Sequence, residues 1–483
     1  MALSDAVEVQ YHVLFPLPYR VLFLFGLGIL AWATILHGLH YLGVDTVSVM
    51  DLKQGTDPMH SAMPTHRSPT CNQSKAVALY NDAYRIFFTY SSFCFASWVA
   101  FRMLTRGDPA RVDAYGYLPV ITAVIIVIIL LCPYRILFHH EREKFTLAIR
   151  RCVFPAPSGP IYFSDVIFAD IGTSFAKVFG ELLLSLCMLK PGNSILNPPV
   201  EDSWMRWVFP IVIRQVNEPL FPFLLRFRQC LIEYNLPENE SQRPLMNALK
   251  YATSFPVIFL SAAQRMVDIV NDKGKKMVGQ PWHGEHPLFR LWLLAAAINS
   301  LYSFWWDITN DWGLDLLRFS PEKVERQPPR PLLLSRLHST TPLINRQSID
   351  SLSSEEKSQA APVDHPLTHR YRQSCFGLRP VLLYPRAIYP VLIFVNLLLR
   401  MSWSIKLSTY VHSSEGGSVA FFWLQVLELF RRWLWVFLRV EWEAIKKARE
   451  PRVATAHADE DDPSGDEGDY EMLPNTPEMS NRT

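Results

Sequence analysis

Apolar runs about as long as a membrane-spanning helix recur along the whole chain. A helix needs roughly 20 mostly apolar residues to cross a bilayer, and the hydropathy pattern predicts nine such spans. Several are interrupted by Pro, Gly or a charged residue, which is expected where a helix lines a water-filled cavity rather than lipid. The predicted spans are Val21–Leu42, Ala83–Phe101, Leu118–Leu131, Ile171–Leu189, Trp204–Leu225, Ala248–Ala263, Leu288–Trp306, Val381–Leu399 and Val419–Leu438.

The segment Arg135–Phe154 mixes apolar residues with a cluster of arginines and lysines. We interpret it as an amphipathic helix that lies at the membrane interface. The basic clusters on the two sides of the third span cannot both be cytoplasmic if that span crosses once. Two explanations stay open: a hidden tenth span, most plausibly in this segment, or a re-entrant element. The predicted fold is therefore all-α: a polytopic transmembrane helical bundle with roughly nine to ten spans.

Polar stretches divide the chain into three parts. Residues 320–373 are rich in Pro, Ser, Arg and Gln and predict a disordered loop, while the acidic residues 459–462 predict a solvated tail. We place N-terminal transmembrane helices in residues 1–133 and the main transmembrane domain, with its disordered loop, in residues 134–443. Residues 444–483 are predicted to form an acidic, disordered C-terminal tail.

Composition matters mainly for what it excludes. Charged residues make up 19% of the chain, below the roughly 25% usual in soluble domains. The net charge is +2, and no basic and aromatic patch or Gly-rich phosphate loop stands out, so nucleic acid is not an expected partner. The seven cysteines form no CxxC pair, and their odd number argues against a disulfide framework. We expect no cofactor and no metal site, and we predict that the protein is not an enzyme.

The stretch Trp305–Leu314 closes a long apolar run, yet it carries two carboxylates among three tryptophans. A charged group in or near hydrocarbon costs roughly 2.5–3.5 kcal/mol on insertion scales, so it is normally kept for a transport path, a partner or an ion. We interpret the tryptophans as a membrane-interface belt. Asp307 and Asp311 lie one helical turn apart, and we predict that they form an inward-facing functional pair.

Cations recur inside the predicted membrane region at Arg226, Lys250, Arg400 and Arg431, each with an aromatic residue nearby. Taken singly, each is expected to reach the headgroups from a helix end. Taken together, four cations on separate helices predict convergence on one cavity that attracts a small anion. Arginine suits phosphate through bidentate hydrogen bonds and lysine adds a point charge, while Tyr251 offers a further donor.

Six ordered blocks carry a resemblance to a known family. The chain resembles the EXS domain family, the membrane domain of eukaryotic phosphate exporters, over about residues 134–443. The blocks are Phe163–Asp170 with Thr173 and Ser174, Leu225–Leu231, Asn247–Tyr251, Trp306–Asp307 with Asp311–Leu314, Leu399–Arg400 with Trp403, and Glu428–Arg432 with Trp435 and Arg439. Six blocks in order over most of the chain form a far more specific signal than one short motif.

The resemblance implies a path for inorganic phosphate through the membrane domain. Residues matching the family's path are Arg226, Lys250, Tyr251, Arg400, Trp403 and Arg431, with Asp170, Asp307 and Asp311 as their acidic partners. Two positions depart from the family: Thr173 supplies a hydroxyl in place of an amide, and Asn396 stands where exporters commonly have an acid. For Trp403, a steric gate and simple helix packing are equally open.

Only about twenty residues precede the first span, too few for the cytosolic SPX domain of the exporters. The chain is therefore similar to the short, SPX-less branch of the family, represented by the yeast ER-retention-defective protein of the Golgi. That resemblance implies a Golgi membrane protein that returns luminal phosphate, a by-product of glycosylation, to the cytosol, and so supports glycosyltransferase recycling and retention of ER luminal proteins.

A second hypothesis is a non-transporting membrane adaptor. It would bind glycosyltransferases or Golgi coat components and sort them between cisternae, and the internal cations would then be structural. Membrane lipid is an expected partner under either hypothesis. A homodimer, the direction of transport, and the choice between a channel and alternating access all stay open.

Overall fold

Helices make up all of the regular structure in the part of the chain that the computed structural model describes. The described residues are 10–50, 69–135, 137–155, 161–188, 211–237, 239–263, 287–314, 316, 378–379, 382–401 and 418–458. The helices are α2 (Leu17–Tyr41), α3 (Thr46–Val49), α4 (Pro69–Thr105), α5 (Pro109–Ala114), α6 (Tyr117–Leu131), α7 (His139–Val153), α8 (Phe163–Ser174), α9 (Ala176–Met188), α11 (Ile211–Tyr234), α12 (Arg243–Ala252), α14 (Pro287–Trp306), η1 (Asp307–Asp311), α15 (Ile388–Arg400) and α17 (Ser418–Ala458).

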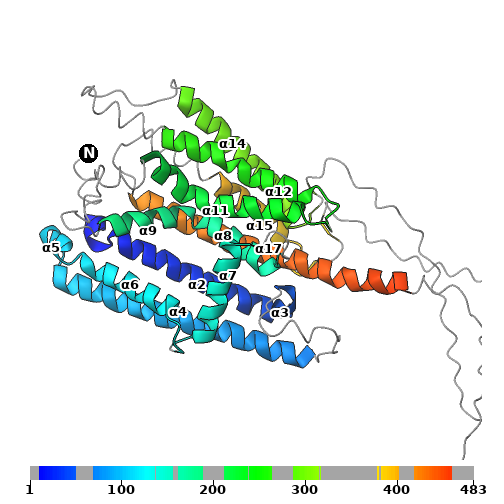
Figure 1. Ribbon diagram of the computed structural model, residues 1–483, viewed down its shortest axis with the longest axis horizontal. Helices are drawn as coiled ribbons and strands as arrows, with labels where there is room; N and C mark the ends of the chain where they lie inside the picture. The colour runs from blue at the N-terminus through cyan, green and yellow to red at the C-terminus, as the bar shows by residue number, and fades with distance from the viewer. Residues whose placement is uncertain are drawn as a thin grey trace, which may run out of the picture.

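The long helix α17 runs through the middle of the molecule (Figure 1). The helices α2, α4 and α6 lie on one side of it, and α11, α12, α14 and α15 lie on the other. A central apolar cluster joins the two sides, and its large, fully buried members are Leu36, Ile167, Trp312, Tyr389 and Trp435. The helix α17 therefore packs against helices from both halves of the chain.

The basic segment before α8 forms the helix α7, which crosses the direction of its neighbours (Figure 1). Arg142 donates to the Cys132 and Tyr134 carbonyls, both at 2.9 Å, and so satisfies backbone acceptors just beyond the end of α6. Arg151 holds Asp165 of α8 through two hydrogen bonds of 2.7 Å. The helix α7 therefore links α6 to α8, the helix that carries Asp170.

Among the described residues, three helices are long and apolar enough to cross a membrane: Leu17–Tyr41, Pro109–Leu131 and Pro287–Asp311. The predicted count of nine to ten spans is not confirmed, since several predicted spans differ from the helices found. The span Ile171–Leu189 is divided into α8 and α9 at Phe175. Thr173 Oγ1 donates to the Asp170 carbonyl at 2.7 Å, a bond that competes with regular helix pairing.

Two other predicted spans begin or end elsewhere. The helix α11 extends to Tyr234, so Arg226 lies within it rather than after its end. The helix α15 begins only at Ile388, because Pro385 cannot continue a helical ladder. The predicted loop at 320–373 lies outside the described residues.

The C-terminal helix is longer than the sequence analysis predicted. The helix α17 continues past residue 443, where we placed the start of the disordered tail, and ends at Ala458. Residues 444–450 read Ala-Ile-Lys-Lys-Ala-Arg-Glu, which are mostly strong helix formers. The acidic residues 459–462 lie outside the described part of the chain.

The helix α14 passes directly into η1, a π-helical turn over Asp307–Asp311. Turns of this kind are rare in proteins overall, and many of those that occur lie at functional sites. Trp306 is 4% exposed and Trp312 is 1% exposed, so the prediction of a membrane-interface belt is wrong for these two tryptophans. Trp312 faces the protein interior because η1 and Gly313 carry the chain back into the central apolar cluster. Trp306, at the end of α14, packs against the Tyr302 and Trp305 rings.

Candidate functional site

Asp307 lies at the centre of the site, and its side chain is fully buried. Lys250 of α12 places Nζ 3.1 Å from Oδ1. Arg400 of α15 approaches Oδ2 with Nε at 3.0 Å and Nη2 at 2.5 Å, and Arg431 of α17 places Nη1 3.9 Å from the same oxygen. Three cations from three helices therefore surround one carboxylate of η1.

Lys250 also joins the second carboxylate of η1. Its Nζ donates to Asp311 Oδ2 at 2.9 Å. On the other side of Asp311, Arg439 Nε lies 3.9 Å from Oδ1. Both carboxylates of the Trp305–Leu314 stretch thus face inward and share one ammonium group, as the sequence spacing predicted.

Asn396 links the Asp307 carboxylate to Arg431. Its Nδ2 donates to Asp307 Oδ2 at 3.2 Å, and its Oδ1 accepts from Arg431 Nη1 at 3.3 Å. Arg431 also binds Glu428 through two nearly parallel bonds, from Nε at 2.8 Å and from Nη2 at 2.6 Å. The Arg431 guanidinium is therefore shared between an amide and a bidentate carboxylate.

A second group of buried charges surrounds Asp170. Arg226 Nε donates to Asp170 Oδ1 at 2.9 Å, and Arg226 Nη1 donates to Gln229 Oε1 at 2.9 Å. The Tyr251 hydroxyl donates to the same Asp170 oxygen. Tyr251 follows Lys250 directly in α12, so one helix connects the groups around Asp170 and Asp307.

Arg432 closes the network between these groups, and the sequence analysis did not select it. Its Nε donates to Ser174 Oγ and its Nη2 to Thr173 Oγ1, both at 2.9 Å. Ser174 Oγ in turn donates to Glu428 Oε1 at 2.8 Å. The guanidinium also stacks 4.7 Å from the centre of the Trp435 ring. The adjacent arginine pair in the sequence was the only signal for this role.

The charges of the site do not cancel. The side chains of the site that are linked by hydrogen bonds include five cations, Arg226, Lys250, Arg400, Arg431 and Arg432, and four carboxylates, Asp170, Asp307, Asp311 and Glu428. This leaves one positive charge in excess before Arg439 is counted. The Asp307, Arg226 and Arg431 side chains are each at most 4% exposed. Buried charges need partners, and each of these arginines is held by a carboxylate, an amide or a hydroxyl group.

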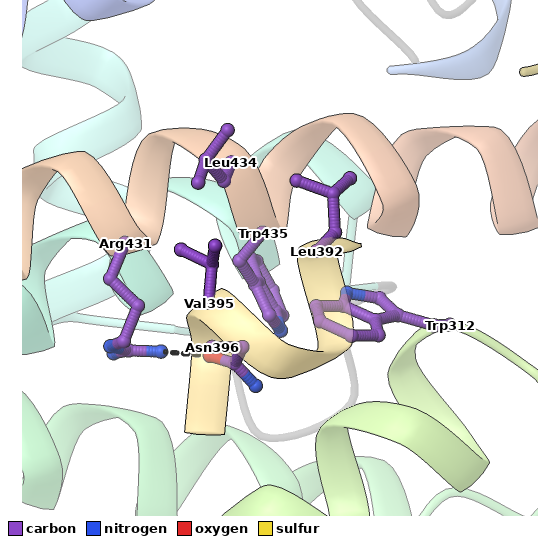
Figure 2. Close-up of a pocket in the computed structure, with 7 residues that line it drawn as sticks. All are labelled: Trp312, Leu392, Val395, Asn396, Arg431, Leu434 and Trp435. Carbon is purple, nitrogen blue, oxygen red and sulfur yellow. Dashed lines mark hydrogen bonds between the residues drawn. The ribbon is translucent and has the colours of Figure 1, made fainter. Parts of the chain in front are cut away.

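A small hollow lies beside Arg431 (Figure 2). Figure 2 shows the Arg431 guanidinium directed at Asn396, with the Trp312 and Trp435 rings farther along the hollow. Its lining residues are Trp312, Leu392, Val395, Asn396, Arg431, Leu434 and Trp435. The hollow thus brings one cation and one amide together with apolar walls, and it is too narrow to hold a water molecule.

Residues 15–445 match the EXS family. The chain belongs to the EXS family. Protein ERD1 homolog 1 of Schizosaccharomyces pombe is 26% identical over 436 residues, which cover 89% of this chain and 91% of that protein. Protein ERD1 of Kluyveromyces lactis is 27% identical over 286 residues, or 58% of each chain. Solute carrier family 53 member 1 of Homo sapiens is 24% identical over 333 residues, or 65% of this chain and 37% of that protein.

Nine of the ten predicted site residues of this EXS chain lie in the connected network. The tenth, Trp403, lies outside the described residues, so its two interpretations stay untested. Thr173 donates its single proton to the Asp170 carbonyl and accepts from Arg432. Its hydroxyl must therefore rotate before it can donate to an anion.

Within the described ranges, no group of three or more His, Cys, Asp and Glu side chains is arranged to hold a metal ion. The carboxylates of the site are instead engaged by arginine, lysine, amide and hydroxyl groups.

Proposed function

We propose that this protein transports inorganic phosphate across the Golgi membrane, from the lumen to the cytosol. The observation that carries the proposal is the group of Lys250, Arg400 and Arg431 around the buried carboxylate of Asp307. Buried cations inside a membrane region are costly and mark ion paths. Membership of the EXS family and similarity to a protein named as a solute carrier support transport rather than catalysis.

The transport step is an exchange of partners. Arg431 and Arg400 hold the carboxylates of Glu428 and Asp307. A phosphate oxyanion offers the same two-oxygen geometry and higher charge, so it replaces a carboxylate in the bidentate contact. The displaced carboxylate remains close and competes for the arginine again. That competition keeps binding weak enough for release, which conduction requires.

The Golgi assignment rests on relatives. The chain is similar over most of its length to Protein ERD1 homolog 1, which fits the short branch of the family. Phosphate released in the lumen by glycosylation is the substrate source that we propose. We propose that the protein, by removing that phosphate, supports the recycling of glycosyltransferases and the retention of ER luminal proteins.

Radiolabelled phosphate flux in proteoliposomes tests the proposal. We expect saturable flux from the purified wild type and a loss of about 10- to 100-fold in Arg400→Ala and Arg431→Ala, since a hydrogen bond to a charged group contributes about 1.5–3 kcal/mol. Arg111→Ala is the matched control, because this arginine is 53% exposed and lies outside the network.

The same experiment separates the transporter from the sorting adaptor. Folding of each variant is checked by size-exclusion chromatography and thermal unfolding. Flux in the wild type and in Arg111→Ala, together with its loss in the two network variants, supports the transporter. No flux from folded wild-type protein, with or without a membrane voltage, contradicts the transporter and favours the adaptor.

A further inference from the structure

Glu181 differs from the other carboxylates of the membrane region in its partner. Asp170, Asp307 and Glu428 each hold a cation in an ion pair. Glu181 of α9 instead accepts a hydrogen bond from the neutral amide of Gln425 in α17. Among the residues that the structure describes, Glu181 forms no salt bridge. The transport mechanism above makes no use of this carboxylate.

The amide opposite Glu181 is only half satisfied. Gln425 is 6% exposed, its Nε2 donates to Glu181 Oε1, and its own Oε1 is buried without a hydrogen-bond partner. A buried acceptor without a donor costs about 1–3 kcal/mol. This acceptor lies next to the Glu181 carboxylate, which already binds the same amide. The missing donor is therefore expected on Glu181.

A proton on Glu181 would supply that donor. A carboxylic acid has one O–H donor and one carbonyl acceptor, while a primary amide has an N–H donor and a carbonyl acceptor. The two groups can therefore pair through two hydrogen bonds, amide N–H to acid carbonyl and acid O–H to amide carbonyl. Only the protonated form of Glu181 completes both bonds with Gln425. The ionised form leaves Gln425 Oε1 facing a negative charge.

Charged groups approach Glu181 from several elements. Arg20 of α2 and Lys177 of α9 interact with it electrostatically. The Arg20 guanidinium is directed at the Phe15 carbonyl and at His12 Nδ1, each at 2.7 Å, and stacks on Tyr11.

The other packed helices complete these surroundings. Along α17, Glu428 follows Gln425 by one turn. The helix α11 also packs against α9, and the side chains of its residues 211–219 lie outside the described part. Carboxylates placed in membrane helices without a direct cation partner are typical of proton relays.

We propose that Glu181 is a proton-binding site that couples proton movement to phosphate movement in this protein. The inference rests on the proposed phosphate transport. Protonation converts the Glu181–Gln425 contact from one hydrogen bond to two, which strengthens the link between α9 and α17. Directly before α9, Ser174 at the end of α8 donates to Glu428 of α17, the carboxylate that holds Arg431. The proton on Glu181 thus acts on the helix that carries the phosphate-binding arginine.

The test uses proteoliposomes with equal radiolabelled phosphate on both sides, zero membrane voltage and a pH difference of about one unit. If one extra proton moves with each phosphate, wild-type accumulation on the less acidic side exceeds that of Glu181→Gln by about tenfold. Both proteins are measured in the same pair of buffers, so the titration of phosphate itself affects the wild type and Glu181→Gln equally. Glu143→Gln, which changes an exposed carboxylate of α7, is the matched control and accumulates phosphate like the wild type.

Two further outcomes keep this inference separate from the proposed function. Equal accumulation by the wild type and Glu181→Gln, with phosphate flux intact, overturns the proton site alone. No wild-type flux even without a pH difference contradicts the transport function. Gln425→Leu tests the same pair from α17 and serves if Glu181→Gln does not fold. The same tenfold loss is expected, and wild-type accumulation in Gln425→Leu overturns the inference.

Discussion

Lys250 and Asp307 form a buried ion pair between α12 and η1, with Nζ 3.1 Å from Oδ1 and an Asp307 side chain that is 0% exposed. The two residues are 57 positions apart in the sequence. An ion pair of this kind stabilises a fold only while both charges keep their partners. The position of α12 beside η1 therefore depends on charge as well as on apolar packing.

Replacement of Asp307 is expected to lower stability strongly. Asp307→Asn removes the carboxylate shared by Lys250 and Arg400, and the loss of one partner from a buried pair costs about 3–5 kcal/mol. Thermal unfolding in detergent measures the effect. Asp82→Asn is the control, because the Asp82–Arg85 pair is exposed and contributes about 0–1 kcal/mol. Equal melting temperatures for the two variants would contradict the prediction.

The Tyr251 hydroxyl is expected to matter through Asp170. Tyr251→Phe keeps the ring but removes a donor to the buried Asp170 carboxylate, so the free energy of unfolding should fall by about 1–3 kcal/mol. Tyr302→Phe is the matched control, because that hydroxyl donates to the Met246 carbonyl at an exposed position. Denaturant unfolding compares the two. A larger loss in Tyr302→Phe would show that Asp170 does not depend on Tyr251.

Restoration of the exporters' acid at position 396 is expected to weaken phosphate binding. In Asn396→Asp a carboxylate replaces the amide whose Nδ2 lies 3.2 Å from Asp307 Oδ2, so two negative charges face each other next to Arg431. The excess positive charge of the site is then lost, and the apparent affinity for phosphate falls by about tenfold, or about 1.4 kcal/mol. Flux at varied phosphate concentration measures this, with Asn239→Asp at the surface as the control. An unchanged or tighter apparent affinity in Asn396→Asp refutes the role of Asn396.

Gly313 is expected to be the glycine least tolerant of a side chain among those with positive φ. Its φ is +60°, and an added Cβ would lie 2.4 Å from the Trp442 ring. Gly43→Ala measures the cost of the left-handed backbone conformation alone, because Gly43 has φ +75° and nothing lies within 4 Å of its Cβ position. We expect Gly43→Ala to lose about 1–2 kcal/mol and Gly313→Ala to lose clearly more. Equal losses in thermal unfolding would mean that Trp442 moves away freely.

Hydropathy and sequence blocks predicted the helical class and most of the site, for separate physical reasons. The apolar runs near α2, α6 and α14 are long and apolar enough to cross a membrane, so hydropathy alone identifies them. The cations at Arg226, Lys250 and Arg400 stand out because a charge is rare in such runs. Their convergence needed the structure, since the partners Lys250 and Asp307 lie far apart in sequence.

The failures of prediction have a common cause in tertiary contacts. Trp306 and Trp312 look like interface residues in sequence, but both are buried. For Trp312 the reason is the preceding π-helical turn, which returns the chain to the central apolar cluster. Arg432 escaped selection because its role depends on Thr173 and Ser174, which lie about 260 residues earlier. Hydropathy also gave no sign of the helix break at Phe175. Next to this break, the Thr173 side chain donates a hydrogen bond to the Asp170 backbone carbonyl.

A structure of the wild-type protein at saturating phosphate tests the exchange of partners most directly. We expect phosphate within hydrogen-bond distance of Arg400 and Arg431, in the hollow beside Asn396, with the Asp307 or Glu428 carboxylate displaced from its arginine. Phosphate bound away from these arginines, or unchanged Arg400–Asp307 and Arg431–Glu428 contacts of 2.5 and 2.6 Å with phosphate present, would contradict the proposed transport site.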